Sequence, residues 1–441
     1  MKLNYKRTFL IGLAFMSISA FWQMYDFTVP LILLDGFHVP EIAKGVIMAL
    51  DNVLALFLLP LLGTLSDKVS TPTGKRMPFI LGGTAVAAVA MIGLPLLDNA
   101  HYADPSKTYT FPLFVVLLGV LLLAMATYRS PAVALMPDLT PKPLRSKANA
   151  VINLMGAVGG VIFLILSTLM FTEKNVRYNY LPVYLIIAGL MVVSVLVLFL
   201  TIKENKLSAE VKAYEAEHPE DDLTVVDETK GVILPKPVRR SLIFILSSIF
   251  LWFMGYNAVT TAFSKYAESE WGMTAGAASL CLTIATAGAI VSYIPIGMIA
   301  SKVGRKRTIL IGVVGITAAF ATAAIYTALG GTFAVWLYGL FILIGFSWAA
   351  INVNSLPMVV EMCRDSDVGK YTGLYYTFSM SAQILTPILS SVFISFLGYR
   401  VLFTYSAVFL GLAFVTMLFV RHGDNKPAVP ASKLEAFDVE D

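Results

Sequence analysis

The chain has 441 residues, of which 57% are hydrophobic and only 14% are charged. An ordinary soluble domain is about 25% charged, so these few charges do not cover a soluble surface of this size. The mean hydropathy of +0.77 also excludes an intrinsically disordered chain. The composition therefore predicts an integral protein of the lipid bilayer. The net charge of +4, which forms no basic patch, argues against a nucleic-acid partner.

Apolar runs long enough to cross a bilayer recur along the whole sequence. A transmembrane helix needs about 20 mostly apolar residues. We therefore expect an all-α membrane protein with twelve spans, at residues 8–34, 42–65, 78–97, 111–136, 147–170, 181–202, 241–264, 274–300, 308–328, 334–357, 371–397 and 400–420. They form two six-helix halves, at 1–202 and 241–420, with a linker at 203–240 and a tail at 421–441.

The distribution of lysine and arginine predicts the orientation of these spans. The segments on the side of the N-terminus carry 25 of the 32 basic residues, and the opposite segments carry 6. Cytoplasmic loops are the ones enriched in basic residues. Both termini are therefore expected in the cytoplasm, and the natural location is the cytoplasmic (inner) membrane of a bacterium.

The segment 203–240 is the only long loop that we expect. It is polar and acidic over Glu215–Asp222 and contains two prolines, Pro235 and Pro237. We interpret it as a solvated tether between the halves, part of it an interfacial helix, with a regulatory site as the alternative.

Two loops in corresponding places of the halves resemble each other, which indicates an internal repeat. Between spans 2 and 3 the sequence reads Gly63-Thr-Leu-Ser-Asp67-Lys68-Val69 and then Gly74-Lys75-Arg76. Between spans 8 and 9 it reads Gly297-Met-Ile-Ala-Ser301-Lys302-Val303-Gly304-Arg305-Lys306-Arg307. The second loop has serine where the first has aspartate. A duplicated six-helix unit is typical of alternating-access transporters.

The first loop resembles the signature of the major facilitator superfamily. Its lengthened form, from Ser66 to Phe79, is similar to the glycoside–pentoside–hexuronide:cation symporters and most of all to their sucrose-transporter branch. A second stretch agrees, from Pro131 through Asp138 to Gly159. The resemblance implies a twelve-helix transporter in two repeats. We also expect a cytoplasmic gating network of Asp67, Lys68, Gly74, Lys75, Arg76 and Asp138, with a counterpart in the second half formed by Glu361, Arg364 and Lys370. The alternative is that these charges only set the topology.

Three charged residues lie well inside spans: Asp26, Asp51 and Arg129. A charge in hydrocarbon is costly, so it normally faces a cavity and has a partner. The two aspartates lie at similar depth in the outer halves of spans 1 and 2. Two nearby buried carboxylates favour a shared proton, so we expect one or both to couple transport to protons. The alternative for each is a structural polar contact.

The family comparison also bears on the coupling ion. The melibiose-type branch has two acids four residues apart in span 2, and aligned on Pro60 those positions are Leu59 and Ala55. Its acid in span 4 is Arg129 here. A sodium ion wants several oxygen ligands, whereas a proton needs one carboxylate, so the proton is favoured over sodium.

Sugars are bound by amides and charged groups through their hydroxyls and by aromatic rings against their C–H faces. Arg129 offers a planar fork of donors, and Asn149 and Asn153 share one helix face. For each aromatic residue, packing is the more common role. The candidate substrate-binding residues are Arg129, Asn153, Asn149, Trp22, Gln23, Tyr25, Asn52, Tyr256, Asn257, Asn352, Asn354 and Gln383.

The sequence therefore predicts a secondary transporter and not an enzyme, since it contains no phosphate loop or nucleophile triad. No cofactor and no metal site are expected. The leading hypothesis is proton-coupled symport of a glycoside, a disaccharide such as sucrose or maltose, by a monomer. The alternatives are an exporter of drugs or metabolites and a sugar sensor that has lost transport.

Overall fold

The computed structural model describes residues 3–141, 144–173, 177–217, 235–362 and 368–424, and every regular element in these ranges is helical. Twelve of the described helices are long and apolar enough to cross a membrane. A helix satisfies its own backbone groups, which is why apolar runs take this form in lipid. The predicted number of spans is confirmed.

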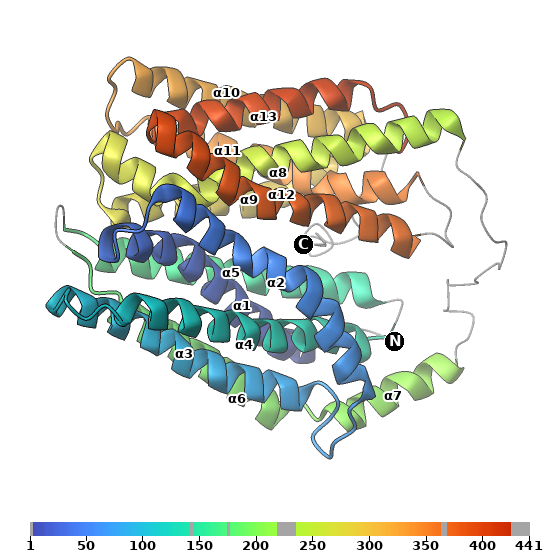
Figure 1. The fold of residues 1–441 in the computed structure, drawn as a ribbon. Helices are drawn as coiled ribbons and strands as arrows, with labels where there is room; N and C mark the ends of the chain where they lie inside the picture. The colour runs from blue at the N-terminus through green and yellow to red at the C-terminus, as the bar shows by residue number, and fades with distance from the viewer. Residues whose placement is uncertain (1–2, 142–143, 174–176, 218–234, 363–367, 425–441) are drawn as a thin grey trace. The chain divides into compact units, whose positions relative to one another are not determined.

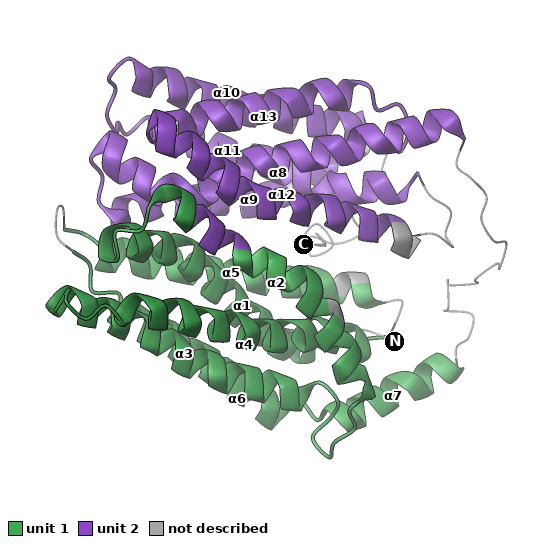
Figure 2. Ribbon diagram, in the orientation of Figure 1, with its two compact units in different colours: residues 1–44, 50–222 green, residues 45–49, 223–441 purple. Residues whose placement is uncertain are grey.

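The chain divides into two compact units, which are described separately (Figure 2). Unit 1 comprises residues 1–44 and 50–222, and unit 2 comprises residues 45–49 and 223–441. The helices of unit 1 are α1 Tyr5–Leu31, the π-helix η1 Ile32–Gly36, α2 Glu41–Lys68, α3 Met77–Ala103, α4 Thr110–Asp138, α5 Arg145–Met170, α6 Leu181–Thr201 and α7 Glu204–Glu217 (Figure 1).

The described residues of unit 2 form six long helices, labelled α8 to α13 in Figure 1. They are α8 Lys236–Trp271, α9 Ala275–Val303, α10 Arg305–Ala328, α11 Leu337–Val360, α12 Val368–Leu397 and α13 Val401–Leu418. Capping residues account for where some of these helices begin and end. Thr274 accepts a hydrogen bond from the Ala277 amide at the start of α9, and Gly272 ends α8 in the left-handed conformation. The predicted span 241–264 is therefore the middle of a longer helix.

Four helix pairs recur in the two units, while the packing of α9 on α11 is a further pair in unit 2. In unit 1, α1 packs on α5 and α6, and α3 packs on α4 and α6. In unit 2, α8 packs on α12 and α13, and α10 packs on α11 and α13. When the six long helices of each unit are numbered in order, these are the same four pairs. The repeat seen in the loops thus extends to the packing.

Helix α7 belongs to unit 1 and lies in the segment predicted as a linker. Unlike the helices that are long and apolar enough to cross a membrane, α7 is mostly polar. Its first residue, Glu204, is only 2% exposed, whereas a solvated tether would leave this carboxylate in water. This part of the segment therefore forms a helix folded against unit 1, and the interpretation of the whole segment 203–240 as a tether stays a prediction.

Candidate functional site

Three helices of unit 1 place the predicted intramembrane charges near one another. Asp26 lies on α1, Asp51 on α2 and Arg129 on α4. Asp51 interacts electrostatically with both Arg129 and Asp26. Asn52 donates a hydrogen bond of 2.9 Å to the Asp51 carboxylate. The two acids are half-buried, and each has a polar or charged neighbour, as a functional charge in a membrane needs.

Aromatic residues of α1 surround this group. Trp22 packs edge-on against Tyr25, with ring centroids 5.4 Å apart, and the Arg129 guanidinium carbon lies 6.0 Å from the Trp22 ring centroid. The Trp22 Nε1 and Tyr25 Oη atoms are buried and have no hydrogen-bond partner among the described residues. Buried donors without partners are rare in folded proteins, so these two are candidates for binding a ligand.

The amides predicted in this half have different surroundings. Asn52 is bound to Asp51, and Gln23 lies opposite Gly160, where a Cβ would be 3.7 Å from its Oε1. Asn149 and Asn153 are half-buried on α5. The binding of a sugar by Arg129, Asn149 and Asn153 stays a prediction.

In unit 2 the predicted residue Tyr256 belongs to an aromatic platform with Trp348 and Phe253. Tyr256 on α8 and Trp348 on α11 are stacked, with centroids 3.6 Å apart and planes inclined by 2°. Phe253 packs edge-on against the same indole at 5.4 Å. The Asn257 Nδ2 atom beside Tyr256 is buried with no partner among the described residues. The stacked rings and the buried Asn257 Nδ2 atom are therefore separate candidate contacts for a ligand.

The remaining amides of unit 2 differ in their availability. Asn354 is 2% exposed, and its Nδ2 donates to the Ala350 carbonyl of its own helix, at 2.9 Å. This amide is therefore engaged by the helix backbone. Asn352 and Gln383 are half-buried, and Asn352 lies one turn beyond Trp348 on α11.

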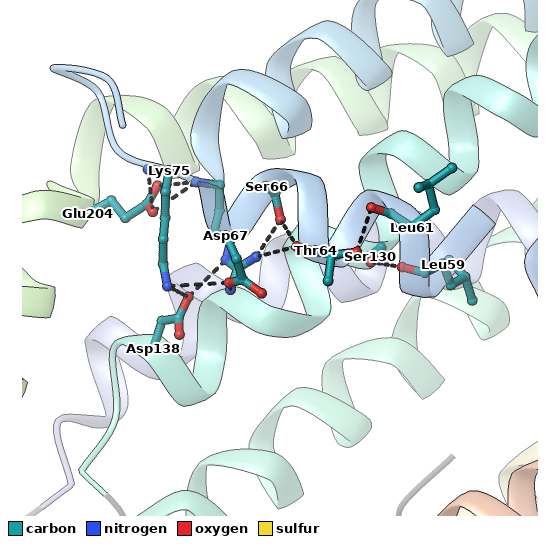
Figure 3. Close-up of polar contacts among 11 residues, drawn as sticks. Leu59, Leu61, Thr64, Ser66, Asp67, Lys75, Ser130, Asp138 and Glu204 are labelled. Carbon is teal, nitrogen blue, oxygen red and sulfur yellow. Dashed lines mark hydrogen bonds and ion pairs between the residues drawn. The ribbon is translucent and has the colours of Figure 1, made fainter. Parts of the chain in front are cut away.

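Four of the predicted gating residues form one ion-paired group, here called the unit 1 charge cluster: Asp67, Lys75, Arg76 and Asp138 (Figure 3). Arg76 donates from Nε to Asp138 Oδ2 at 2.9 Å and pairs with Asp67 through Nη2. Lys75 Nζ lies 3.1 Å from Asp138 Oδ2. The cluster links the end of α2, the start of α3 and the end of α4.

The other two predicted gating residues of unit 1 lie beside the cluster. Lys68 is the exposed last residue of α2. Gly74 has a φ of +125°, a conformation that side chains with a Cβ rarely adopt. It turns the chain immediately before Lys75 and Arg76. Gly74 therefore has a backbone role at this turn.

Glu204 completes this site, and sequence reasoning did not single it out. Its carboxylate accepts hydrogen bonds from three successive backbone amides at the start of α3: Lys75 at 2.8 Å, Arg76 at 2.9 Å and Met77 at 3.0 Å. Figure 3 shows it at the backbone end of Lys75, away from Asp138. A solitary acid after a span gives no signal in the sequence that it contacts a loop far earlier in the chain.

Unit 2 has a smaller version of this arrangement. Arg305, at the start of α10, pairs with Glu361 at the end of α11, with Nη1 and Oε1 2.8 Å apart. Asp424 accepts from the Lys306 backbone amide at 2.8 Å, next to Gly304, whose φ is +94°. The predicted partner Arg364 lies outside the described residues. Glu361 is therefore paired at this end, with Arg305 as a partner that was not predicted.

Comparison with protein families gives a match over nearly the whole chain. The model of the Major Facilitator Superfamily matches residues 11–269 and 245–439. Sucrose transport protein SUC3 of Arabidopsis thaliana is 34% identical over 121 residues, which are 25% of this chain and 20% of that protein. Sucrose transport protein SUT3 of Oryza sativa subsp. indica is 28% identical over 168 residues, 35% of this chain and 33% of that protein.

A further relative is Proton-associated sugar transporter A of Mus musculus, 27% identical over 141 residues, 30% of this chain and 18% of that protein. The similarity thus spans a third or less of each of these three relatives.

Solved structures match the fold over most of the chain. A bacterial homologue of the iron transporter ferroportin, in its inward-facing state, has a TM-score of 0.67 at 16% identity and covers 95% of this chain and 99% of its own. The nucleoside transporter NupG has a TM-score of 0.67 at 14% identity and covers 94% and 100%. The peptide transporter POT has a TM-score of 0.69 at 12% identity and covers 95% of both chains. At these identities the likeness concerns the fold alone.

Proposed function

Because this chain belongs to the major facilitator superfamily, we propose that it is a secondary transporter that carries a glycoside together with a proton. The substrate class is a disaccharide such as sucrose or maltose, and the protein works by alternating access as a monomer. The observation that carries this proposal is the group of Asp26, Asp51 and Arg129 inside the spans of unit 1.

Proton coupling is supported by the chemistry of that group. Two carboxylates that interact with each other do not both ionise easily in a low-dielectric region, so one of them holds and releases a proton. Arg129 stays charged and stabilises the ionised form of Asp51 when the proton leaves. Sodium would need more oxygen ligands than Asp26, Asp51 and Asn52 offer.

A sugar substrate is supported by the aromatic rings and amides of both units. Trp22 with Arg129 in unit 1, and the Tyr256–Trp348 stack with Asn257 in unit 2, provide ring faces next to hydrogen-bond donors. The names of the relatives, two sucrose transport proteins and a proton-associated sugar transporter, favour the same class.

The proposal extends to gating. The unit 1 charge cluster holds the ends of α2, α3 and α4 together on the proposed cytoplasmic side. Its ion pairs favour one conformational state of the transport cycle, the outward-open one, and are broken in the other.

Purified protein in liposomes tests this function. A proton gradient, acidic outside, is imposed, and uptake of radiolabelled sucrose, maltose and glucose is measured with and without sodium. We expect uphill uptake of one disaccharide that a protonophore abolishes and sodium does not change. The matched control is Asp104→Asn, in an exposed loop.

The same measurement separates the alternatives. An exporter accumulates its substrate only when the gradient is reversed, and a sensor binds sugar without any flux. Uptake that needs sodium and ignores the proton gradient would reject proton coupling.

A further inference from the structure

The carboxylate of Glu204 occupies the amino end of α3. It accepts from the backbone amides of Lys75, Arg76 and Met77, with Arg76 bonded to both oxygens, at 2.9 and 3.2 Å. The first amides of a helix have no partner within the helix, and the helix dipole places partial positive charge there. Here a residue of another helix supplies the missing acceptor and the negative charge.

The neighbouring residue ties the same loop a second time. Asn205 Nδ2 donates to the carbonyls of Thr71 and Pro72, at 2.9 and 3.1 Å. At the far end of α7, Glu215 pairs with Arg145 at the start of α5, at 3.4 Å. Helix α7 is thus attached at both ends to unit 1, across the starts of α3 and α5.

The geometry of the loop leaves room for this contact only because residue 74 is glycine. A Cβ at position 74 would collide with the Glu204 carboxylate, and the positive φ would strain it as well. The amides that Glu204 binds belong to the residues whose side chains enter the charge cluster: Arg76 reaches Asp67 and Asp138, and Lys75 reaches Asp138.

Unit 2 has a corresponding contact between an acid and the start of a helix, in a weaker form. Asp424 follows α13, the sixth long helix of its unit, as Glu204 follows α6, and it binds the Lys306 amide beside a positive-φ glycine. Asp424 is exposed, whereas Glu204 is buried. The recurrence of an acid after the sixth helix, on the start of the third, indicates that the contact is part of the duplicated unit.

We propose that Glu204 is a positioning residue of the gate: it fixes the backbone of residues 75–77 so that Lys75 and Arg76 reach their carboxylate partners. Helix α7 is then a working part of the gate and not only a tether. The role in transport rests on the proposed function, but the role in fixing the loop does not.

Hydrogen–deuterium exchange of residues 70–80 tests the positioning without any transport assay. The variants are Glu204→Ala and the isosteric Glu204→Gln, which keeps the packing if the alanine variant does not fold. The control is Glu210→Gln, an exposed acid on the same helix. We expect the amides of residues 75–77 to exchange about tenfold faster in Glu204→Ala, about threefold faster in Glu204→Gln, which keeps one acceptor oxygen but loses the charge and the second acceptor, and at the wild-type rate in the control. Unchanged exchange in Glu204→Gln would overturn the proposal.

The second arm asks whether Glu204 acts through Arg76. Flux of the transported sugar is compared in Glu204→Gln, Arg76→Ala and the double variant. We expect Glu204→Gln to lower the maximal rate about three- to tenfold at unchanged KM, and the double variant to be no slower than Arg76→Ala. Independent, multiplying losses would overturn the positioning role. A protein that transports none of the sugars would defeat the proposed function, and the exchange measurement would still decide the proposal made here.

Discussion

Unit 1 and unit 2 share four helix pairs but differ in the polar groups that their spans carry. The spans expected in unit 1 contain two acids, Asp26 and Asp51, and have Arg129 well inside them, whereas the six spans expected at 241–420 contain no Asp or Glu. Unit 2 has the stacked pair Tyr256 and Trp348 instead. The two halves of the repeat therefore carry different polar and aromatic residues in their spans. The difference suggests a division of labour, with proton handling in unit 1 and sugar-ring contacts in both.

The ion pairs formed by the corresponding loops of the two units also differ. In unit 1, Arg76 is shared between Asp67 and Asp138, while in unit 2 Arg305 pairs with Glu361 and position 301, where Asp67 has its counterpart, is serine. Breaking a network of four ion-paired charges removes more stabilisation than breaking a single ion pair. The stronger gate is therefore expected in unit 1.

The largest expected effect is the loss of coupling in Asp51→Asn or Asp26→Asn. The amide cannot bind and release a proton, so uphill uptake driven by a proton gradient should fall at least about a hundredfold in the coupling residue's variant. Sugar counterflow, which needs no net proton movement, should persist. Full uphill uptake in both single variants would remove the contrast between the two interiors.

The control for this test is a carboxylate outside the spans. Hydrogen bonds from the Ser106 hydroxyl and amide hold the pKa of Asp104 below its usual value, so it is ionised at neutral pH. Replacing it by asparagine should leave the pH profile of uptake between about pH 5 and 8 unchanged, because no group that titrates in that range is removed.

Arg129→Lys should weaken sugar binding almost as much as Arg129→Ala. A lysine keeps the charge but cannot reproduce the planar fork, and losing a charge-assisted hydrogen bond costs about 1.5–3 kcal/mol, or roughly ten- to hundredfold in affinity. Isothermal titration on purified protein measures this. Near-normal affinity in the lysine variant would show that Arg129 is a structural cation whose charge alone matters.

Arg76→Ala should slow the cycle more than Arg305→Ala. Removing a charge-assisted bond shifts the balance between two states by about tenfold or more, and Arg76 makes more of them than Arg305. The maximal flux is the measurement, with sugar affinity as the control that should not change. Equal losses in the two variants would mean that both ends gate equally.

The smallest effect is expected at the aromatic platform of unit 2. Trp348→Phe keeps a smaller ring, and an aromatic pair is worth about 0.5–1.5 kcal/mol, so KM should rise about two- to tenfold with little change in maximal rate. Trp348→Leu should do more. If both substitutions leave KM unchanged, the stack is packing, and sugar contacts belong to unit 1 alone.

The fold followed from the sequence because hydrophobic length and the repeated loops each leave few choices. The charge cluster also followed, since the loop motif resembles a known family and the ion pairs join residues of that motif with Asp138. Glu204 and Asp424 did not follow, because a backbone N–H group donates to any carboxylate that folding brings to it. Asn354 shows the converse: residue type suggested a ligand role, and the structure has its Nδ2 donating to a carbonyl of its own helix.

The parallel stack of Tyr256 and Trp348 gives the protein a built-in optical signal. An indole emits according to the polarity and ring contacts around it, and only five tryptophans contribute to the spectrum of this chain. Trp348 is held flat against a phenol ring at 3.6 Å, so a sugar that displaces the tyrosine or covers the indole's other face changes its emission. Substrate screening can therefore begin with unlabelled protein in a fluorimeter, before any flux is measured.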